Sequence, residues 1–309
     1  MKLFLWPTTN ILTFIKNIFF FKNHTHVELL LNKYYKGGYP VLCNSARVGI
    51  KLILEKENLN KKELVQIFPY ASQCVVEAVG FSSTPYCAIQ NYENENYKIL
   101  YNQWGYRNSN LSSSKNYIDD CADSLVDIDT NIFFDTKSKF IIWSLPKIIS
   151  SLSGGIIWCK NKEDAVYLNK KIHSNKGSYF LLLIKFLLLY SSSLYKIWNL
   201  KIYKNPNLTI LETSDIYSRL KNLKEIIEDR KNKIKLFKKY LPIKYELSSK
   251  YLPCVVPLTN GDFKKYELFM NSYCGVRHFY DRNKKIFLKT YPLPIHQDVS
   301  LSKLLKFKA

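Results

Sequence analysis

The sequence Ile141-Ile-Trp-Ser-Leu-Pro-Lys-Ile-Ile-Ser-Ser-Leu-Ser-Gly-Gly-Ile-Ile-Trp-Cys159 places one lysine between two apolar runs. Phe140–Trp143 and Ile156–Trp158 are predicted to be strands, so Lys147 lies on the connection at their ends. Burial removes the hydration of an amine there and makes it a nucleophile toward aldehydes and ketones. The adjacent Gly154 and Gly155 permit a close backbone approach that a side chain would block. In a lysine-rich chain a surface lysine on an ordinary turn is the simpler interpretation, and only partners elsewhere in the sequence argue against it.

The composition indicates a folded chain with a large core. Of its 309 residues, 47% are hydrophobic and 15% aromatic, which argues against wholesale disorder and predicts one large domain and a smaller one. The net charge of +21 comes mostly from lysines spread along the chain beside Asn, Ile and Tyr. This spread favours the coding bias of an AT-rich genome, so no nucleic-acid partner is expected. A polyanion such as RNA or an acidic membrane surface stays open as the alternative, although no short basic cluster favours it.

The cysteines and histidines predict neither a disulfide framework nor a metal site. None of the seven cysteines forms a Cys-x-x-Cys pair, which is typical of reduced thiols, so we expect a cytoplasmic protein. The pair His24-x-His26 is too weak a pattern to predict a metal.

Two apolar segments resemble membrane elements without fitting one. Met1–Lys22 is interrupted by Pro7 and Lys16 and has no small-residue cleavage site after it, unlike a signal peptide. Tyr179–Tyr190 is too short to span a bilayer and contains Lys185. We expect the second segment to be a buried or interface helix, and a peripheral membrane contact is the alternative.

Predicted strands and helices alternate along the first half of the chain. This alternation predicts an α/β fold with a mostly parallel sheet covered by helices, in which ligands bind beyond the carboxyl ends of the strands. The expected strands are Glu63–Phe68, Tyr86–Ile89, Tyr97–Tyr101 and Asn116–Ile118, with helices at Ser72–Val79 and Lys162–Ser174. The candidate site residues beyond strand ends are Ser45, Pro69–Gln73, Asn102–Gly105, Asp120 and Lys147.

Ser45 is predicted to cap a helix whose buried face includes Val48, Leu52 and Ile53. A helix N-terminus that follows small residues is a ready site for a phosphate group. Alone this signal is weak, because any capped helix has a similar pattern.

Taken in order, these motifs resemble those of the DegT-like sugar aminotransferases, which are pyridoxal-phosphate (PLP) enzymes of fold type I. The resemblance runs from about residue 40 to residue 305. The segments that carry it are Ser45-Ala-Arg47, Asn102-Gln-Trp-Gly105, Ile118-Asp-Asp-Cys-Ala-Asp123, Ser144-Leu-Pro-Lys147 with Gly154-Gly155, Asp215–Tyr240 with its closing Arg230, and Tyr291–His296.

The resemblance implies a role for each matching residue. Lys147 would bind PLP covalently and act as general base and acid, and Asp120 would face the pyridine nitrogen. The phosphate would be held by backbone N–H groups of Ala46 and Arg47 behind Ser45, and by the hydroxyl of Ser144. Asn205 matches a family residue that crosses to the phosphate of the neighbouring subunit, so a homodimer is implied.

Several positions depart from the family pattern. Asp123 stands where the family has a glutamine that bonds the 3′-oxygen of the cofactor, and a carboxylate there repels a phenolate. Tyr70 and Gln73 compete for the place of the aromatic that stacks on the ring. Asn102 replaces a histidine, and the arginine expected after Asn205 is missing.

The resemblance also implies a domain plan and an activity. We expect an arm over residues 1–40, a large PLP-binding domain over 41–210, and a long helix with a small α+β domain over 211–309. The small domain would contain a strand at Cys254–Leu258, a helix around Phe263–Met270, and the segment from Phe287 onward. The implied activity is amino transfer from an amino acid to a nucleotide-linked keto sugar in surface polysaccharide synthesis. The alternative is a relative that has lost activity and keeps a binding or structural role.

Overall fold

The computed structural model describes residues 4–89, 97–105, 117–130, 133–134, 138–240, 250–258, 277–281 and 284–302. The helix expected around Phe263–Met270 lies outside these residues.

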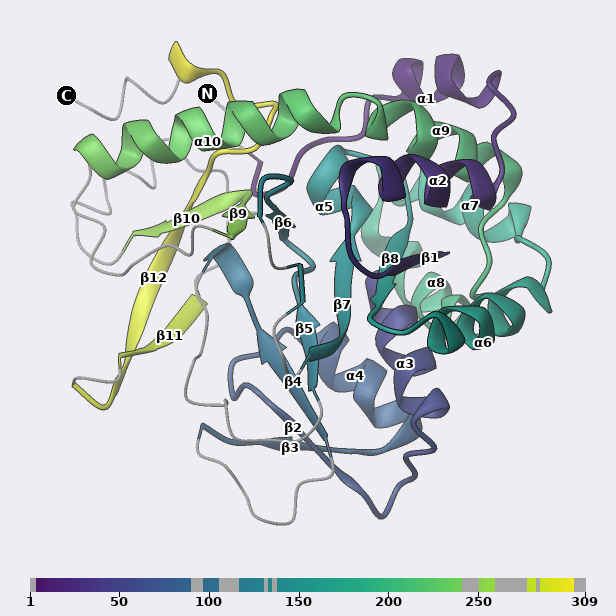
Figure 1. Cartoon of the computed structure of the whole chain (residues 1–309), viewed down its shortest axis with the longest axis horizontal. Coiled ribbons are helices and arrows are strands. Elements are labelled where there is room, and N and C mark those ends of the chain that lie inside the picture. Colours follow the sequence, from purple (N-terminus) through teal and green to yellow (C-terminus); the bar gives the residue numbers. More distant parts are fainter. Residues whose placement is uncertain are drawn as a thin grey trace.

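A seven-stranded sheet forms the centre of the fold (Figure 1). Its strands lie in the order β1 (Tyr39–Cys43), β8 (Gly155–Cys159), β7 (Ser138–Ser144), β5 (Tyr117–Asp120), β4 (Tyr97–Tyr101), β2 (Leu64–Ile67) and β3 (Thr84–Cys87). Neighbouring strands from β7 to β3 are parallel, whereas β8 is antiparallel to both β7 and β1. The expected mostly parallel sheet is therefore confirmed.

Side chains of the central strands alternate between two separate cores. On β7, Phe140 and Ile142 belong to one core, and Ile141 and Trp143 belong to the other. Successive residues of a strand point to opposite faces, so a continuous apolar run fills both sides of the sheet. This double burial explains why the two runs that flank Lys147 contain almost no polar residue.

Helices cover both faces of the sheet (Figure 1). Residues of α3 (Ala46–Lys56), α4 (Gln73–Ser82), α6 (Lys162–His173), α7 (Tyr179–Leu187) and α8 (Tyr195–Ile202) pack in one core. Residues of α2 (His24–Tyr34), α5 (Leu145–Ile149), α9 (Ile210–Leu220) and α10 (Leu223–Tyr240) pack in the other. Before them, α1 (Ile11–Ile18) packs through Phe14 against α7.

The prediction of one long helix over Asp215–Tyr240 is wrong in one respect, because the structure has two helices there, α9 and α10. The first helix begins earlier, at a capping box in which Thr209 and Glu212 bond each other's backbone N–H groups. A turn at Lys221 and Asn222 separates the two helices. The apolar stripe continues across that turn, since Leu220 and Leu223 are both fully buried, and for this reason the sequence gives no sign of the break.

Short antiparallel strands follow α10, as expected for a small C-terminal α+β unit. In one sheet β12 (Ile286–Pro294) lies between β10 (Val255–Leu258) and β11 (Arg277–Asp281). In the other, β9 (Tyr251–Pro253) pairs with β6 (Ser124–Val126), which directly follows Asp123. The C-terminal strands are therefore joined to the large sheet at one border of the candidate site.

Candidate functional site

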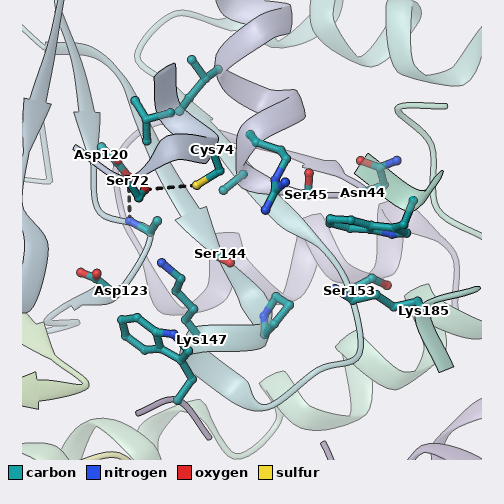
Figure 2. A pocket seen from close by; sticks show the side chains of 18 of the residues that line it. Asn44, Ser45, Ser72, Cys74, Asp120, Asp123, Ser144, Lys147, Ser153 and Lys185 are labelled. Carbon is teal, nitrogen blue, oxygen red and sulfur yellow. Dashed lines mark hydrogen bonds between the residues drawn. The ribbon is translucent and has the colours of Figure 1, made fainter. Parts of the chain in front are cut away.

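A cavity of about 260 Å³ lies beyond the carboxyl ends of β5 and β7 (Figure 2). Seven residues to which the resemblance gives a role line it: Ser45, Ala46, Arg47, Asp120, Asp123, Ser144 and Lys147. In Figure 2 the Lys147 side chain points into the cavity, with Asp120 and Asp123 on one side and Ser45, Asn44 and Lys185 toward the other. The cavity thus has an acidic end, a cationic end and an amine between them.

Lys147 lies on the short helix α5, which connects β7 to β8. Pro146 occupies the first turn of this helix, where its missing N–H costs nothing, and Ser150 ends the helix in a left-handed conformation. The backbone of the next residue, Ile148, is fixed by two hydrogen bonds. Its carbonyl accepts from Arg230 Nη2 at 2.8 Å and from Gln297 Nε2 at 3.2 Å. On the cavity side, the Lys147 ammonium lies 4.4 Å from the ring centre of Trp6.

Asp120 and Asp123 are both almost fully buried. Burial raises the pKa of Asp120 to about 6 and the Asp123 carboxylate adds to the rise, whereas the Lys147 ammonium opposes it. Asp120 also accepts a hydrogen bond from the backbone N–H of Ala122 at 3.1 Å. Burial likewise raises the pKa of Asp123, which Lys147, the N–H of Trp104 and Arg277 pull down. Two neighbouring buried carboxylates need positive charge, and a protonated ring nitrogen would supply it.

The N-terminus of α3 forms the opposite end of the cavity. As predicted, Ser45 caps this helix, with its Oγ 3.4 Å from the N–H of Val48. The N–H groups of Ala46 and Arg47 have no acceptor within the helix. Gly155 packs directly against them, because a Cβ added there would lie 2.5 Å from the nitrogen of Ala46. The two glycines therefore join the strand that follows the lysine to the start of α3.

The Arg47 side chain turns away from α3 toward α8. Its Nη1 donates to the hydroxyl of Tyr195 at 3.0 Å and to Oδ1 of Asn199 at 2.5 Å. Its guanidinium also lies 4.9 Å from the ring centre of Trp198. The helix pair α7 and α8 is thereby fastened to the cationic end of the cavity.

Several predicted residues do not lie in the cavity. Gln73, the first residue of α4, is exposed and lies 3.5 Å from Glu77. Its competitor Tyr70 stacks instead on His278, with ring centres 4.6 Å apart. Asn205 donates to the carbonyl of Lys201 at 3.1 Å. Neither Tyr70, in the turn before α4, nor Gln73, at the first position of α4, lines the cavity, so the structure gives neither of them a ring to stack on there.

Asn102 also lies outside the cavity. It is buried and donates to Asp119, the neighbour of Asp120 that points to the other face of β5.

Ser72, from the predicted segment Pro69–Gln73, also lines the cavity. The structure adds residues that the sequence patterns do not indicate: Lys185 and Trp198 reach the cavity from α7 and α8, Trp6 from the N-terminal arm, and Cys74 from the start of α4. Lys185 had one available signal, since a lone lysine inside an apolar run needs a polar surrounding. Trp6 and Trp198 had none, because only tertiary packing brings them to the site.

This arrangement fits PLP. An amine stands between a buried carboxylate pair and a helix N-terminus, and these groups match an aldehyde, a basic ring nitrogen and a phosphate. The fold and the cavity together define a PLP-dependent enzyme of the α/β transferase class.

The chain belongs to a family of PLP-dependent aminotransferases. Residues 27–299 match the family model described as "Putative PLP-dependent aminotransferase". No curated protein matches the chain.

Solved structures of sugar aminotransferases share the fold at low sequence identity. The "Putative sugar aminotransferase Spr1654 from Streptococcus pneumoniae, PLP-form" has a TM-score of 0.67 at 13% identity, covering 99% of this chain and 96% of that one. A DegT DnrJ EryC1 StrS aminotransferase from Brucella abortus has a TM-score of 0.61 at 14% identity, covering 92% and 88%. DesV of S. venezuelae has a TM-score of 0.64 at 12% identity, covering 92% and 87%. These likenesses confirm the expected fold.

Within the described residues, no helix is both long and apolar enough to cross a bilayer.

Proposed function

We propose that this aminotransferase transfers an amino group from an amino acid, with glutamate as the expected donor, to a keto sugar carried by a nucleotide. The proposal includes a role in surface polysaccharide synthesis. It is supported by the motif order from about residue 40 to residue 305, and by structural neighbours whose titles name sugar aminotransferases.

One observation carries the assignment of the site: Lys147 and Asp120 face the same cavity, with the N-terminus of α3 at its other end. Bound PLP supplies an electron sink that allows an amino group to leave one carbon and join another. Lys147 would hold the cofactor through its Nζ and, when that amine is free, would accept and return the proton of the reacting substrate carbon. The Asp120 carboxylate keeps the ring nitrogen protonated.

The remaining residues position the cofactor. The N–H groups of Ala46 and Arg47 and the hydroxyls of Ser45 and Ser144 bind the phosphate. Asp123 lies beside Asp120 and sets the charge near the ring. We assign Asn205 to the neighbouring subunit of a homodimer, since it lies outside the cavity of its own chain.

Reductive labelling tests the role of Lys147. Purified protein is mixed with PLP, treated with borohydride, digested and mapped by mass spectrometry. The label should be on Lys147. A second lysine, Lys185, lines the same cavity and serves as an internal control. A label on Lys185, or on no lysine, contradicts the assignment.

Asp120→Asn tests the acid at the ring. Loss of a charge-assisted hydrogen bond should slow the half-reaction with glutamate by an amount equivalent to at least roughly 1.5–3 kcal/mol. Asp119→Asn is the matched control, because Asp119 does not line the cavity. An unchanged rate of pyridoxamine phosphate formation in Asp120→Asn would refute the role.

A further inference from the structure

Two cations meet at the phosphate end of the cavity. Lys185 Nζ lies 4.2 Å from the ring centre of Trp198, and the Arg47 guanidinium lies 4.9 Å from the same ring centre. Both residues line the cavity together with Ser45 and Ala46. The Trp198 indole therefore makes cation–π contacts with two side chains, Lys185 from α7 and Arg47 from α3.

Neither cation has an anionic partner in the described part of the chain. Arg47 donates to a hydroxyl and to an amide oxygen, both of which are neutral. The nearest acid that affects Lys185 is Glu212, whose carboxylate accepts from Ser153, Thr209 and the backbone of Thr209 at 2.6–2.8 Å. Burial and the Arg47 charge lower the pKa of Lys185 to about 8, and Glu212 opposes this only in part. Two like charges that share a partly enclosed cavity leave a place for an anion between them.

We propose that Lys185, together with Arg47, binds the phosphate group of the cofactor from within the same chain. The proposal rests on the PLP assignment of the cavity. It adds to the backbone donors of α3 an ammonium from α7, a helix outside every motif of the family resemblance. The Trp198 ring holds the Lys185 ammonium by a cation–π contact, so the phosphate would lie between this ammonium and the N-terminus of α3.

The polarity of the cavity favours the cofactor phosphate over a substrate phosphate. Asp120 and Asp123 lie at one end, and Arg47, Lys185 and the start of α3 lie at the other (Figure 2). A ligand with a basic nitrogen at one end and a phosphate at the other satisfies both ends at once. A nucleotide diphosphate would satisfy only the cationic end.

The test compares two ligands that differ only in the phosphate. Dissociation constants for PLP and for pyridoxal, which lacks the phosphate, are measured for the wild type, Lys185→Met and Lys201→Met. Lys201 is the matched control, because it also lies over an aromatic ring, Phe180 at 4.6 Å, on the same helix pair but outside the cavity. The preference for PLP over pyridoxal should fall roughly ten- to a hundredfold in Lys185→Met and stay unchanged in Lys201→Met. Lys185→Arg should keep most of the preference.

A labelling experiment on the wild type avoids any folding defect of the variants. PLP and inorganic phosphate should each slow the reaction of Lys185 with an amine-reactive reagent, measured by mass spectrometry, and leave Lys201 unaffected. If Lys185→Met binds PLP and pyridoxal more weakly by the same factor, or not more weakly at all, its preference for PLP is unchanged and the assignment of Lys185 is overturned. Protection by uridine diphosphate but not by PLP also overturns it and points to a substrate phosphate. If the wild-type protein does not bind PLP, the cofactor assignment itself is refuted.

Discussion

The Asp120 carboxyl has different proton affinities in the folded and unfolded chain, and stability should depend on pH accordingly. Its folded pKa of about 6 exceeds the ordinary value of 3.8, so the folded state binds more protons between these values. The contribution of Asp120 is therefore favourable at low pH and is lost as the pH rises through 6. Cofactor-free Asp120→Asn should gain stability over the wild type between about pH 4 and pH 7, by on the order of 3 kcal/mol.

Urea unfolding of both cofactor-free proteins at several pH values measures this difference. The comparison cancels the titrating groups that do not interact with Asp120. A difference in unfolding free energy that is the same at every pH would show that Asp120 is not held in a buried, acidic surrounding.

Asp123 should set the pH at which the visible band of bound PLP titrates. A carboxylate near the 3′-oxygen disfavours its negative form, so Asp123→Gln should move that titration to lower pH. Pyridoxamine phosphate formation from glutamate should remain detectable in both proteins. An unchanged titration would mean that Asp123 does not interact with the cofactor. Its role would then be structural, through the hydrogen bond that it accepts from the N–H of Trp104 at 3.2 Å.

The sequence predicts the cavity residues that follow strand ends and misses those that arrive by tertiary packing. Asp120, Asp123, Ser144 and Lys147 lie together because neighbouring strands end at one edge of the sheet. Gln73 lies outside the cavity, because the first turn of α4 directs Cys74 and not Gln73 toward it. Lys185 belongs to a segment whose apolar residues dominate its pattern, and its role appears only when α7 is placed beside α3.

The Gly154-Gly155 segment should be essential for the geometry of α3 and β8. In Gly155→Ala the new Cβ would lie 2.5 Å from the backbone of Ser45 and Ala46, so the helix start must move. We expect a loss of about 1–3 kcal/mol in stability and weaker PLP binding, because the displaced N–H groups are the proposed phosphate donors.

Gly80→Ala is the control for this prediction. Gly80 lies inside α4, and no atom lies within 4 Å of an added Cβ. It should stabilise the protein by roughly 0.5–1 kcal/mol through helix propensity and leave PLP binding unchanged. Thermal unfolding and PLP titration measure both effects. If Gly155→Ala and Gly80→Ala have the same stability and PLP affinity, Gly155 does not pack closely against the start of α3.

Some element boundaries are predicted closely, as for the helix over Lys162–Ser174, which the structure gives as Lys162–His173, whereas the strand predicted at Tyr86–Ile89 begins two residues after the start of β3. The prediction for Tyr97–Tyr101 coincides with β4, because five buried residues between polar segments allow little else. The turn between α9 and α10 was missed, because the buried stripe continues from Leu220 to Leu223 without a proline or glycine. A helix that ends without a breaking residue is set by what it packs against.

An exposed apolar stretch on the N-terminal arm is a candidate for the interface of the proposed homodimer. Phe19, Phe20 and Phe21 are 67%, 51% and 66% exposed, which is unusual for three consecutive phenylalanines. If this stretch lies in the proposed homodimer interface, Phe20→Glu should shift the protein toward monomer in light scattering at micromolar concentration. Val166→Glu on α6, which is 60% exposed, should not.

A wild type that is monomeric at every concentration would contradict the homodimer. Cosedimentation with anionic vesicles that is lost in Phe20→Glu, without a change of mass, would assign the stretch to a membrane surface instead. The high net positive charge would then add an attraction that salt weakens.

The buried guanidinium of Arg230 has a consequence for synthesis on the ribosome. It donates to the carbonyls of Ile148 and Leu252 and to Gln297, so it ties the lysine helix to two segments made much later. A nascent chain that has emerged only through α10 has the lysine and its flanking strands but not these two partners. We therefore expect the helix that holds Lys147 to be fixed in its final position after translation has passed Gln297. Cofactor loading is therefore expected to follow translation of the small C-terminal strands.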